Sequence, residues 1–186
     1  VNSIVNAEHN KSPVIAASYY GNAIVLFDTV RKNVFYLLND TVITESMFEN
    51  LSRKIFSDSK KNIWICGATY GISKLLIPQS VDFKNYPLAD SIMHIIYAST
   101  KTWHTSIAKN IGYVNNVFDI NENADGSYWL TTQGQGLLKF FPNDSTTFVS
   151  YSNDIKSLQG LAKDKNENLW MVSSTGLLHY NVNDNR

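Results

Sequence analysis

The four histidines of this 186-residue chain are the first candidates for metal binding or acid–base chemistry. They are His9, His94, His104 and His179, and they lie far apart, without the i, i+4 spacing of a helical metal site or a neighbouring cysteine pair. His94 belongs to an apolar run, which favours a buried histidine, whereas His104 follows a tryptophan and could reach a ligand. We therefore predict no metal site.

The segment DINENADGS, Asp119–Ser127, carries oxygen-bearing side chains at alternate positions, as calcium loops do. An EF-hand loop needs glycine at its sixth position and glutamate at its twelfth, but Ala124 and Leu130 stand there. A hairpin turn in which Asp and Asn side chains cap their own backbone fits this segment better.

Other catalytic patterns are absent from the sequence. There is no GxSxG elbow, no Walker loop and no dinucleotide fingerprint. Cys66 is the single cysteine, so no internal disulfide can form, and its place after Trp64 in an expected strand predicts a buried, inert thiol. We expect no catalytic residues and no cofactor, and hence no enzyme activity in this segment.

Charge and hydropathy exclude two kinds of partner. Sixteen basic residues balance sixteen acidic ones, so no net field gathers phosphates, and nucleic acid is not an expected partner. No apolar run approaches the roughly 20 residues of a membrane helix, and the start VNSIVNAEHN lacks the regions of a signal peptide. We expect no direct membrane insertion, and the first residue, Val1, favours a piece of a longer protein.

A repeat organises the chain, and tryptophans mark it. Each of three segments contains an apolar strand, a polar turn, a tryptophan strand, a glycine and another apolar strand. The matching residues are Ile55, Ile120 and Leu161 before the turn; Asp58, Asn123 and Asp164 in the turn; Trp64, Trp129 and Trp170; Gly71, Gly136 and Gly176; and finally Leu75, Phe140 and Tyr180.

Two weaker copies extend the repeat. Trp103 takes the tryptophan place in one of them, with Ser91–Ala98 as the preceding strand, and Ile15 takes it in PVIAASYYGNAIVLF. The step from Trp103 to Trp129 is too short by roughly one strand and its turn. Either that strand was lost, or a segment near 108–116 is missing from the sequence. The expected repeats are 1–50, 51–90, 91–114 (short), 115–156 and 157–186 (truncated).

The architecture follows from these units. Short apolar runs between Asp, Asn, Ser and Gly turns predict small antiparallel sheets. A tryptophan needs about 200 Å² of apolar cover, more than one small sheet supplies, so neighbouring sheets must stack, and radial stacking of four-stranded sheets is a β-propeller. We predict an all-β fold over 1–186, a partial propeller of about four to five blades. Its tryptophans, Trp64, Trp103, Trp129 and Trp170, should pack between blades.

Two segments, YWLTTQGQGLLKF and LWMVSSTGLLHY, identify a known pattern. The chain resembles the two-component regulator propeller repeat of Bacteroidetes hybrid two-component sensors. The family's small hydroxyl residue after the tryptophan is kept at Ser106, Thr132 and Ser173 but replaced at Gly67. The resemblance implies a periplasmic propeller of an inner-membrane receptor that binds an oligosaccharide or other small ligand and signals to a histidine kinase. It also implies a homodimer through the parent receptor.

Sugar rings stack on aromatic side chains, so aromatic and amide residues in exposed loops are candidate ligand contacts. If the tryptophan strand is second from the propeller axis, the loop after it opens on the face that carries the links between blades. The predicted ligand-binding residues are Tyr19, Tyr20, Tyr70, His104, Gln133 and Gln135. The alternative is that the tyrosines merely cover blade edges.

Two other functions stay open at this point. The propeller could be an interaction or dimerisation scaffold that binds no small ligand. It could also be a propeller lyase or hydrolase, which would need a cluster of His and Glu side chains on one rim.

Overall fold

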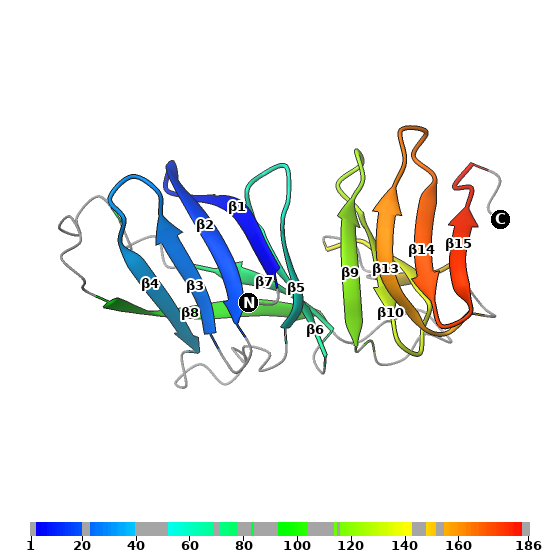
Figure 1. Cartoon of the computed structure of the whole chain (residues 1–186), viewed down its shortest axis with the longest axis horizontal. Coiled ribbons are helices and arrows are strands. Elements are labelled where there is room, and N and C mark those ends of the chain that lie inside the picture. The colour runs from blue at the N-terminus through cyan, green and yellow to red at the C-terminus, as the bar shows by residue number, and fades with distance from the viewer. Residues whose placement is uncertain are drawn as a thin grey trace. The chain divides into compact units, whose positions relative to one another are not determined.

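The computed structural model confirms an all-β chain (Figure 1). In the residues that it describes, no segment forms an α-helix, and no helix there is long and apolar enough to cross a membrane. The chain divides into two compact units, Val1–Ile65 with Ser73–Thr102 and Cys66–Ile72 with Trp103–Arg186. The described residues are 3–19, 23–39, 52–68, 71–77, 83, 93–103, 114, 116–142, 148–151 and 155–183.

The first blade consists of four antiparallel strands that follow one another in the sheet in chain order. They are β1 (Ser3–His9), β2 (Ser12–Tyr19), β3 (Ala23–Asp28) and β4 (Val34–Asn39). The register of β1 and β2 leaves only Asn10 and Lys11 in their turn. Both residues have positive φ, 49° and 61°, as a type I′ hairpin turn requires.

The second blade comprises β5 (Ser52–Ser57), β6 (Ile63–Gly67), β7 (Ile72–Leu76) and β8 (Met93–Trp103), in the sheet order β8-β7-β6-β5. Strand β8 also pairs in parallel with β4, which joins the first two blades in one eight-stranded sheet. The first six residues of β8, Met93–Ala98, match the six residues of β4 one to one.

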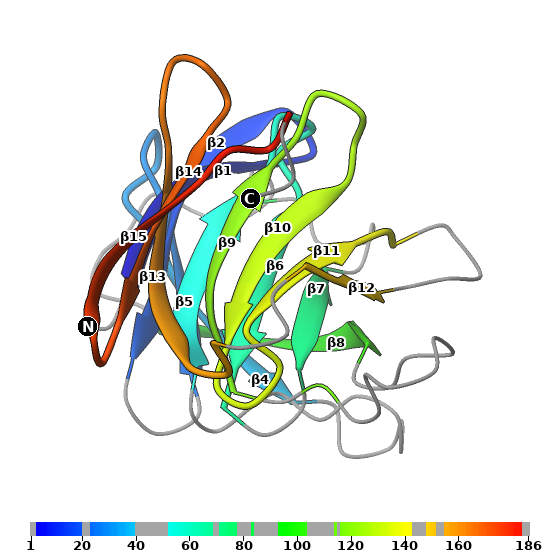
Figure 2. The ribbon, with the colours of Figure 1, turned by 90° about the vertical axis from the view of Figure 1, so that its right-hand side faces the viewer.

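The third and fourth blades belong to the second unit (Figure 2). The third has the order β12-β11-β10-β9, and the fourth has three strands, β13-β14-β15. Their bounds are β9 (Val117–Glu122), β10 (Tyr128–Thr132), β11 (Leu137–Phe140), β12 (Phe148–Ser150), β13 (Leu158–Lys163), β14 (Leu169–Ser173) and β15 (Gly176–Tyr180). These small antiparallel sheets are the predicted blades. The exact repeat boundaries stay a prediction.

One turn type recurs before the tryptophan strands of blades two, three and four. The first turn residue, Asp58, Asn123 or Asp164, donates its backbone N–H to the carbonyl four positions later. The fourth residue is left-handed, with φ of 65°, 79° and 66° at Lys61, Gly126 and Glu167. This is the three-residue hairpin loop in which a type I turn is followed by one left-handed residue.

Each unit has a core between its two blades. In the first unit, a hydrogen bond joins the two blades, because the Ser3 hydroxyl in β1 donates to the carbonyl of Ile55 in β5 at 3.2 Å. Strand β6 is buried along its whole length, and Cys66 within it has no exposed surface, as the sequence predicts. One buried cluster in the first unit contains Ala7, Val14, Ala16, Ile24, Leu26, Phe35, Leu37, Ile55, Ile63, Ile65, Leu75 and Phe83. One buried cluster in the second unit contains Trp129, Leu137, Leu158, Leu169, Met171 and Tyr180.

Candidate ligand-binding site

The predicted ligand residues fall unevenly on the structure. Gln133 and Gln135 lie together in the loop between β10 and β11. Tyr19 is the last residue of β2, where it pairs with Ala23 of β3. The other three predicted residues, Tyr20, Tyr70 and His104, lie outside the described residues.

Hydrogen bonds hold the β10–β11 loop in one conformation. The Thr132 hydroxyl donates to the carbonyl of Gly136 at 3.0 Å and accepts the backbone N–H of Gln135 at 3.2 Å. The backbone N–H groups of Gly134 and Gly136 both donate to the carbonyl of Lys156. Gln133 is exposed at the tip and Gln135 is half-buried, so the loop presents a side-chain amide on a fixed backbone.

The same loop is bonded to the links that precede β9 and β13. The backbone N–H of Gln133 donates to the carbonyl of Asn116 at 3.0 Å, and Gln133 forms an isolated bridge with Ser157. Asn116 in turn donates to the carbonyl of Ala68, in the loop after β6, at 3.1 Å. The loop after the tryptophan strand therefore opens on the face that carries the links.

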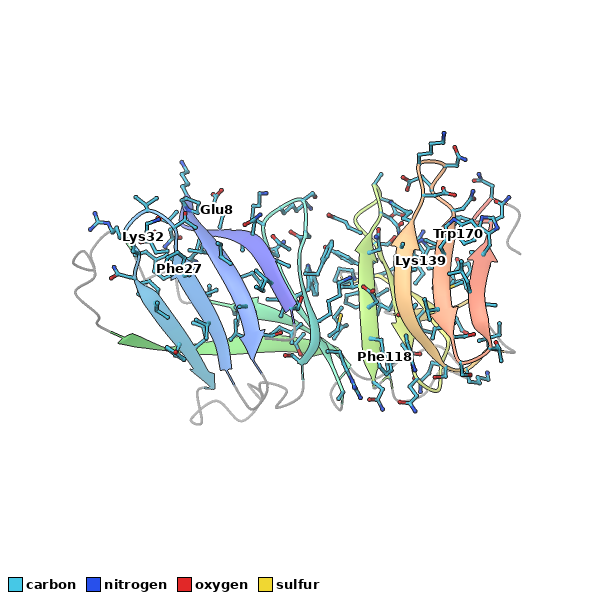
Figure 3. The ribbon with its side chains drawn as sticks, in the orientation of Figure 1. Glu8, Phe27, Lys32, Phe118, Lys139 and Trp170 are labelled. Atoms are coloured by element: carbon cyan, nitrogen blue, oxygen red, sulfur yellow. The ribbon has the colours of Figure 1, made fainter. Side chains whose placement is uncertain are left out.

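The tryptophans of the repeat occupy different environments. Trp64 and Trp129 are each 2% exposed, and Trp129 packs against the fourth blade, with its ring 6.1 Å from that of Tyr180. Trp170 is 40% exposed, although it holds the same place in its repeat (Figure 3). Trp103 lies at the end of β8, and its side chain is outside the described part.

The Asp119–Ser127 segment forms a hairpin turn, and its acidic groups have partners within the fold. Asp119 accepts the backbone N–H of Leu161 at 3.1 Å and thereby ties β9 to β13. Hydrogen bonds from the side chain and backbone of Ser127, and the Lys139 ammonium, lower the pKa of Asp125 to about 2 against its partial burial. In the described part of the chain, no group of three or more His, Cys, Asp or Glu is placed to hold a metal.

The first unit contains a pocket that the sequence pattern did not predict. The pocket volume is about 320 Å³. The β1–β2 turn, the β5–β6 turn and strand β7 line it, and its wall contains Glu8, His9 and three lysines, Lys60, Lys61 and Lys74. The sequence signal for this pocket is the pair Lys60–Lys61 in a turn, followed by Lys74 in the same repeat. In sequence alone, these lysines are typical of a solvent-exposed surface.

Comparisons with known proteins place the chain among propeller proteins. No family model matches it. It is 21% identical to histidine kinase P4 of Formosa agariphila, over 97% of this chain and 12% of the kinase. It is similar to the extracellular domains of two hybrid two-component systems from B. thetaiotaomicron, with TM-scores of 0.70 and 0.66 and identities of 16% and 15%. These alignments cover 97% and 100% of this chain but 22% and 24% of those chains.

A streptogramin B lyase has a similar fold, with a TM-score of 0.53 and 13% identity over 96% of this chain and 54% of the lyase. At such identities the likeness shows the fold. The predicted β-propeller class is confirmed, and so is the resemblance to extracellular domains of hybrid two-component systems. The chain spans about an eighth of the length of the histidine kinase and about a quarter of the length of the two extracellular domains.

Proposed function

We propose that this chain is part of the ligand-sensing propeller of a two-component receptor, that it binds an oligosaccharide in the periplasm, and that a histidine kinase reads the result. The observation that carries the proposal is that 97% or more of the chain aligns with extracellular domains of hybrid two-component systems and with a histidine kinase. In this proposal the segment has no catalytic activity of its own, and the parent receptor signals as a homodimer.

The β10–β11 loop supports the ligand part of the proposal. Sugar hydroxyls both donate and accept hydrogen bonds, and a side-chain amide offers both kinds of group. Gln133 presents such an amide to solvent, and Gln135 stands beside it. Because the loop backbone is held by Thr132 and Lys156, little conformational entropy would be lost on binding.

The same hydrogen bonds supply a route for a signal. The carbonyl of Lys156 belongs to the link between the third and fourth blades, and it accepts from two residues of the β10–β11 loop. A ligand that shifts Gly134 or Gly136 must therefore shift the start of the fourth blade or break these bonds. A ligand changes an equilibrium between arrangements only as far as it binds one of them better.

Titration calorimetry of the purified chain against a panel of oligosaccharides tests the proposal. We expect at least one to bind, and Gln133→Ala and Gln135→Ala each to weaken it about 5- to 10-fold, the effect of one lost hydrogen bond. Asn166→Ala is the matched control, because it removes an exposed amide from the β13–β14 turn. Silence across the panel would count against sugar recognition.

An interaction scaffold is the second candidate, and exposed apolar side chains on the fourth blade favour it. Trp170, Val172 and Leu177 are 40%, 47% and 66% exposed. However, the fourth blade covers Trp129 at the matching position, so this face has the composition of a surface between blades. Concentration-dependent self-association, together with no binding of any sugar, would favour the scaffold. Turnover of a polysaccharide would instead favour a propeller lyase or hydrolase.

A further inference from the structure

The lysine pocket of the first unit lies between two turns at the same end of the unit, those of β1–β2 and β5–β6 (Figures 1 and 2). Figure 3 marks Glu8 at this end of β1. The pocket volume of about 320 Å³ lies at the lower end of the range for small-molecule sites. It is large enough for a small ligand.

Both turns are fixed by local bonds. In the first, Asn10 and Lys11 have the left-handed φ values of a type I′ turn. In the second, the buried Asp58 carboxylate accepts the backbone N–H groups of Lys60 and Asn62 at 3.0 and 2.8 Å, and the Trp64 indole N–H at 2.9 Å. The backbone that carries the lysines is therefore in place before any ligand arrives.

The third blade has an ion pair at this position of the repeat. When the two repeats are aligned on their tryptophans, Lys60 and Lys74 take the places of Asp125 and Lys139. Asp125 and Lys139 form an ion pair, with 3.1 Å between Oδ2 and Nζ. The second blade has a cation in both places, so the carboxylate that neutralises the lysine of the third blade is missing from it.

The geometry of the two lysines is otherwise the same. The Nζ of Lys74 lies 5.9 Å from the ring centroid of Trp64, and the Nζ of Lys139 lies 5.5 Å from that of Trp129. This cation–π contact holds each ammonium over its indole. Lys74 is thus positioned like Lys139, with a like charge instead of a carboxylate beside it.

The nearby carboxylates offset the three lysines only in part, because Glu8 lies in the wall and Asp58 lies buried within the β5–β6 turn. Lys61 adds a third ammonium, and Glu8 is the one carboxylate in the wall. Within the described residues, neither Lys60, Lys61 nor Lys74 forms an ion pair. By contrast, Glu167 holds the turn position of Lys61 in the fourth blade and pairs with a lysine at 2.6 Å. Cations gathered around a cavity favour a bound anion.

Apolar side chains complete the pocket. Ile63 and Leu75 are buried in its wall, and Leu76 is 42% exposed there. A ring with one apolar face and one anionic group would meet both kinds of surface. Pockets of this type combine apolar lining with a few charged groups that fix orientation.

We infer that this pocket binds the carboxylate or sulfate group of a small anionic saccharide, with the anion between Lys60 and Lys74 where the third blade has the Asp125 carboxylate. The inference that the pocket binds an anion depends only on the geometry of the lysines. The inference that the anion belongs to a saccharide rests on the proposed function.

Calorimetry with four probes tests the inference: glucuronate, glucose 6-sulfate, glucose and inorganic sulfate. We expect glucuronate or glucose 6-sulfate to bind at least about 10-fold more tightly than glucose, because a hydrogen bond to a charged group is stronger than a neutral one. Added NaCl should weaken this binding. Equal affinity for glucose and for both charged sugars would overturn the inference. Inorganic sulfate that binds as tightly as glucose 6-sulfate would keep the anion site and overturn the saccharide part.

Lys60→Asp is the decisive variant, because it rebuilds in the second blade the ion pair of the third. We expect it to abolish binding of the charged sugars and Lys74→Gln to weaken it about 10-fold or more. Lys165→Gln, in the turn of the fourth blade, is the matched control and should change nothing. Unchanged affinity in Lys60→Asp would refute the site. Circular dichroism and thermal melting establish that each variant is folded.

The outcomes separate this site from the proposed function. Loss of sugar binding in the Gln133 and Gln135 variants, with no effect of Lys60→Asp, refutes the pocket and keeps the sensor proposal. A charged sugar that binds through Lys60 and Lys74, with no neutral oligosaccharide bound at Gln133, keeps the pocket and moves the ligand site away from the β10–β11 loop.

Discussion

Trp129 and Trp170 hold the same place in consecutive repeats, yet one is buried and the other is not. Trp129 is 2% exposed, with the rings of Tyr151 and Tyr180 at 4.9 and 6.1 Å. Trp170 is 40% exposed, and its ring neighbour is His179 of its own sheet, at 4.6 Å. The comparison shows that the next blade, rather than the sheet that carries a tryptophan, supplies most of its cover.

Truncating these two residues gives the largest expected difference. Trp129→Ala should lower the free energy of unfolding by about 3–5 kcal/mol, because it leaves a cavity between two blades. Trp170→Ala should cost clearly less than Trp129→Ala, because 40% of the Trp170 surface is already exposed. Urea denaturation followed by circular dichroism measures both. Equal losses would show that cover by the next blade is not what matters.

The turn aspartates of the second and fourth blades give the next difference. Asp58 is 3% exposed and accepts from a buried indole N–H, whereas the equivalent bond from Trp170 to Asp164 is 3.4 Å long and exposed. Asp58→Ala leaves buried donors without an acceptor and should cost about 2–3 kcal/mol. Asp164→Ala should cost less than Asp58→Ala, because its hydrogen bond from Trp170 is long and exposed. The same denaturation experiment distinguishes them, and a larger loss for Asp164→Ala would contradict this account.

The Asp125–Lys139 ion pair predicts a pH dependence in the third blade. The pKa of Asp125 is lowered to about 2 from its ordinary value of 3.8, so its contribution to stability is complete above that ordinary value and is lost as the pH falls through about 2. Asp125→Asn should therefore cost about 0.5–1 kcal/mol at pH 7, since the carboxylate is largely exposed, and almost nothing near pH 2. Melting curves of both proteins between pH 7 and pH 2 measure this. A constant difference would exclude the ion pair as its source.

The left-handed turn position gives the smallest effect. Glu167→Gly should raise the free energy of unfolding by at most about 0.5 kcal/mol, because glycine takes the positive φ without strain but loses the exposed ion pair with Lys163. Gly126→Ala, at the same position of the third blade, should lower it by about 1 kcal/mol. Differential scanning calorimetry detects both shifts. Shifts of the same sign would contradict the assignment of this position.

Local chemistry explains what could be predicted from the sequence. The turn at Asp58, Asn123 and Asp164 depends on side chains that cap their own backbone, so its residues reveal it directly. The position of Gln133 on the face that carries the links between blades follows from the order of the strands within one blade.

Long-range pairing explains what could not be predicted. The parallel pairing of β8 with β4 joins residues that are far apart in sequence, and Trp103 carries the marks of a separate repeat. The lysine pocket likewise needs Glu8 beside Lys60, which only the packing of two blades provides. The exposure of Trp170 depends on what lies next to its sheet, and its own sequence is the same as that of a covered tryptophan.

The burial of Cys66 in β6 has a practical consequence. Thiol reagents react with the exposed thiolate, so this single cysteine can be labelled only when β6 opens. The rate of labelling at low denaturant concentration therefore reports the opening of one strand, in a molecule without any introduced probe. Strand β6 begins at Ile63, in the wall of the lysine pocket. A ligand bound in the pocket would therefore stabilise β6 and slow the labelling reaction.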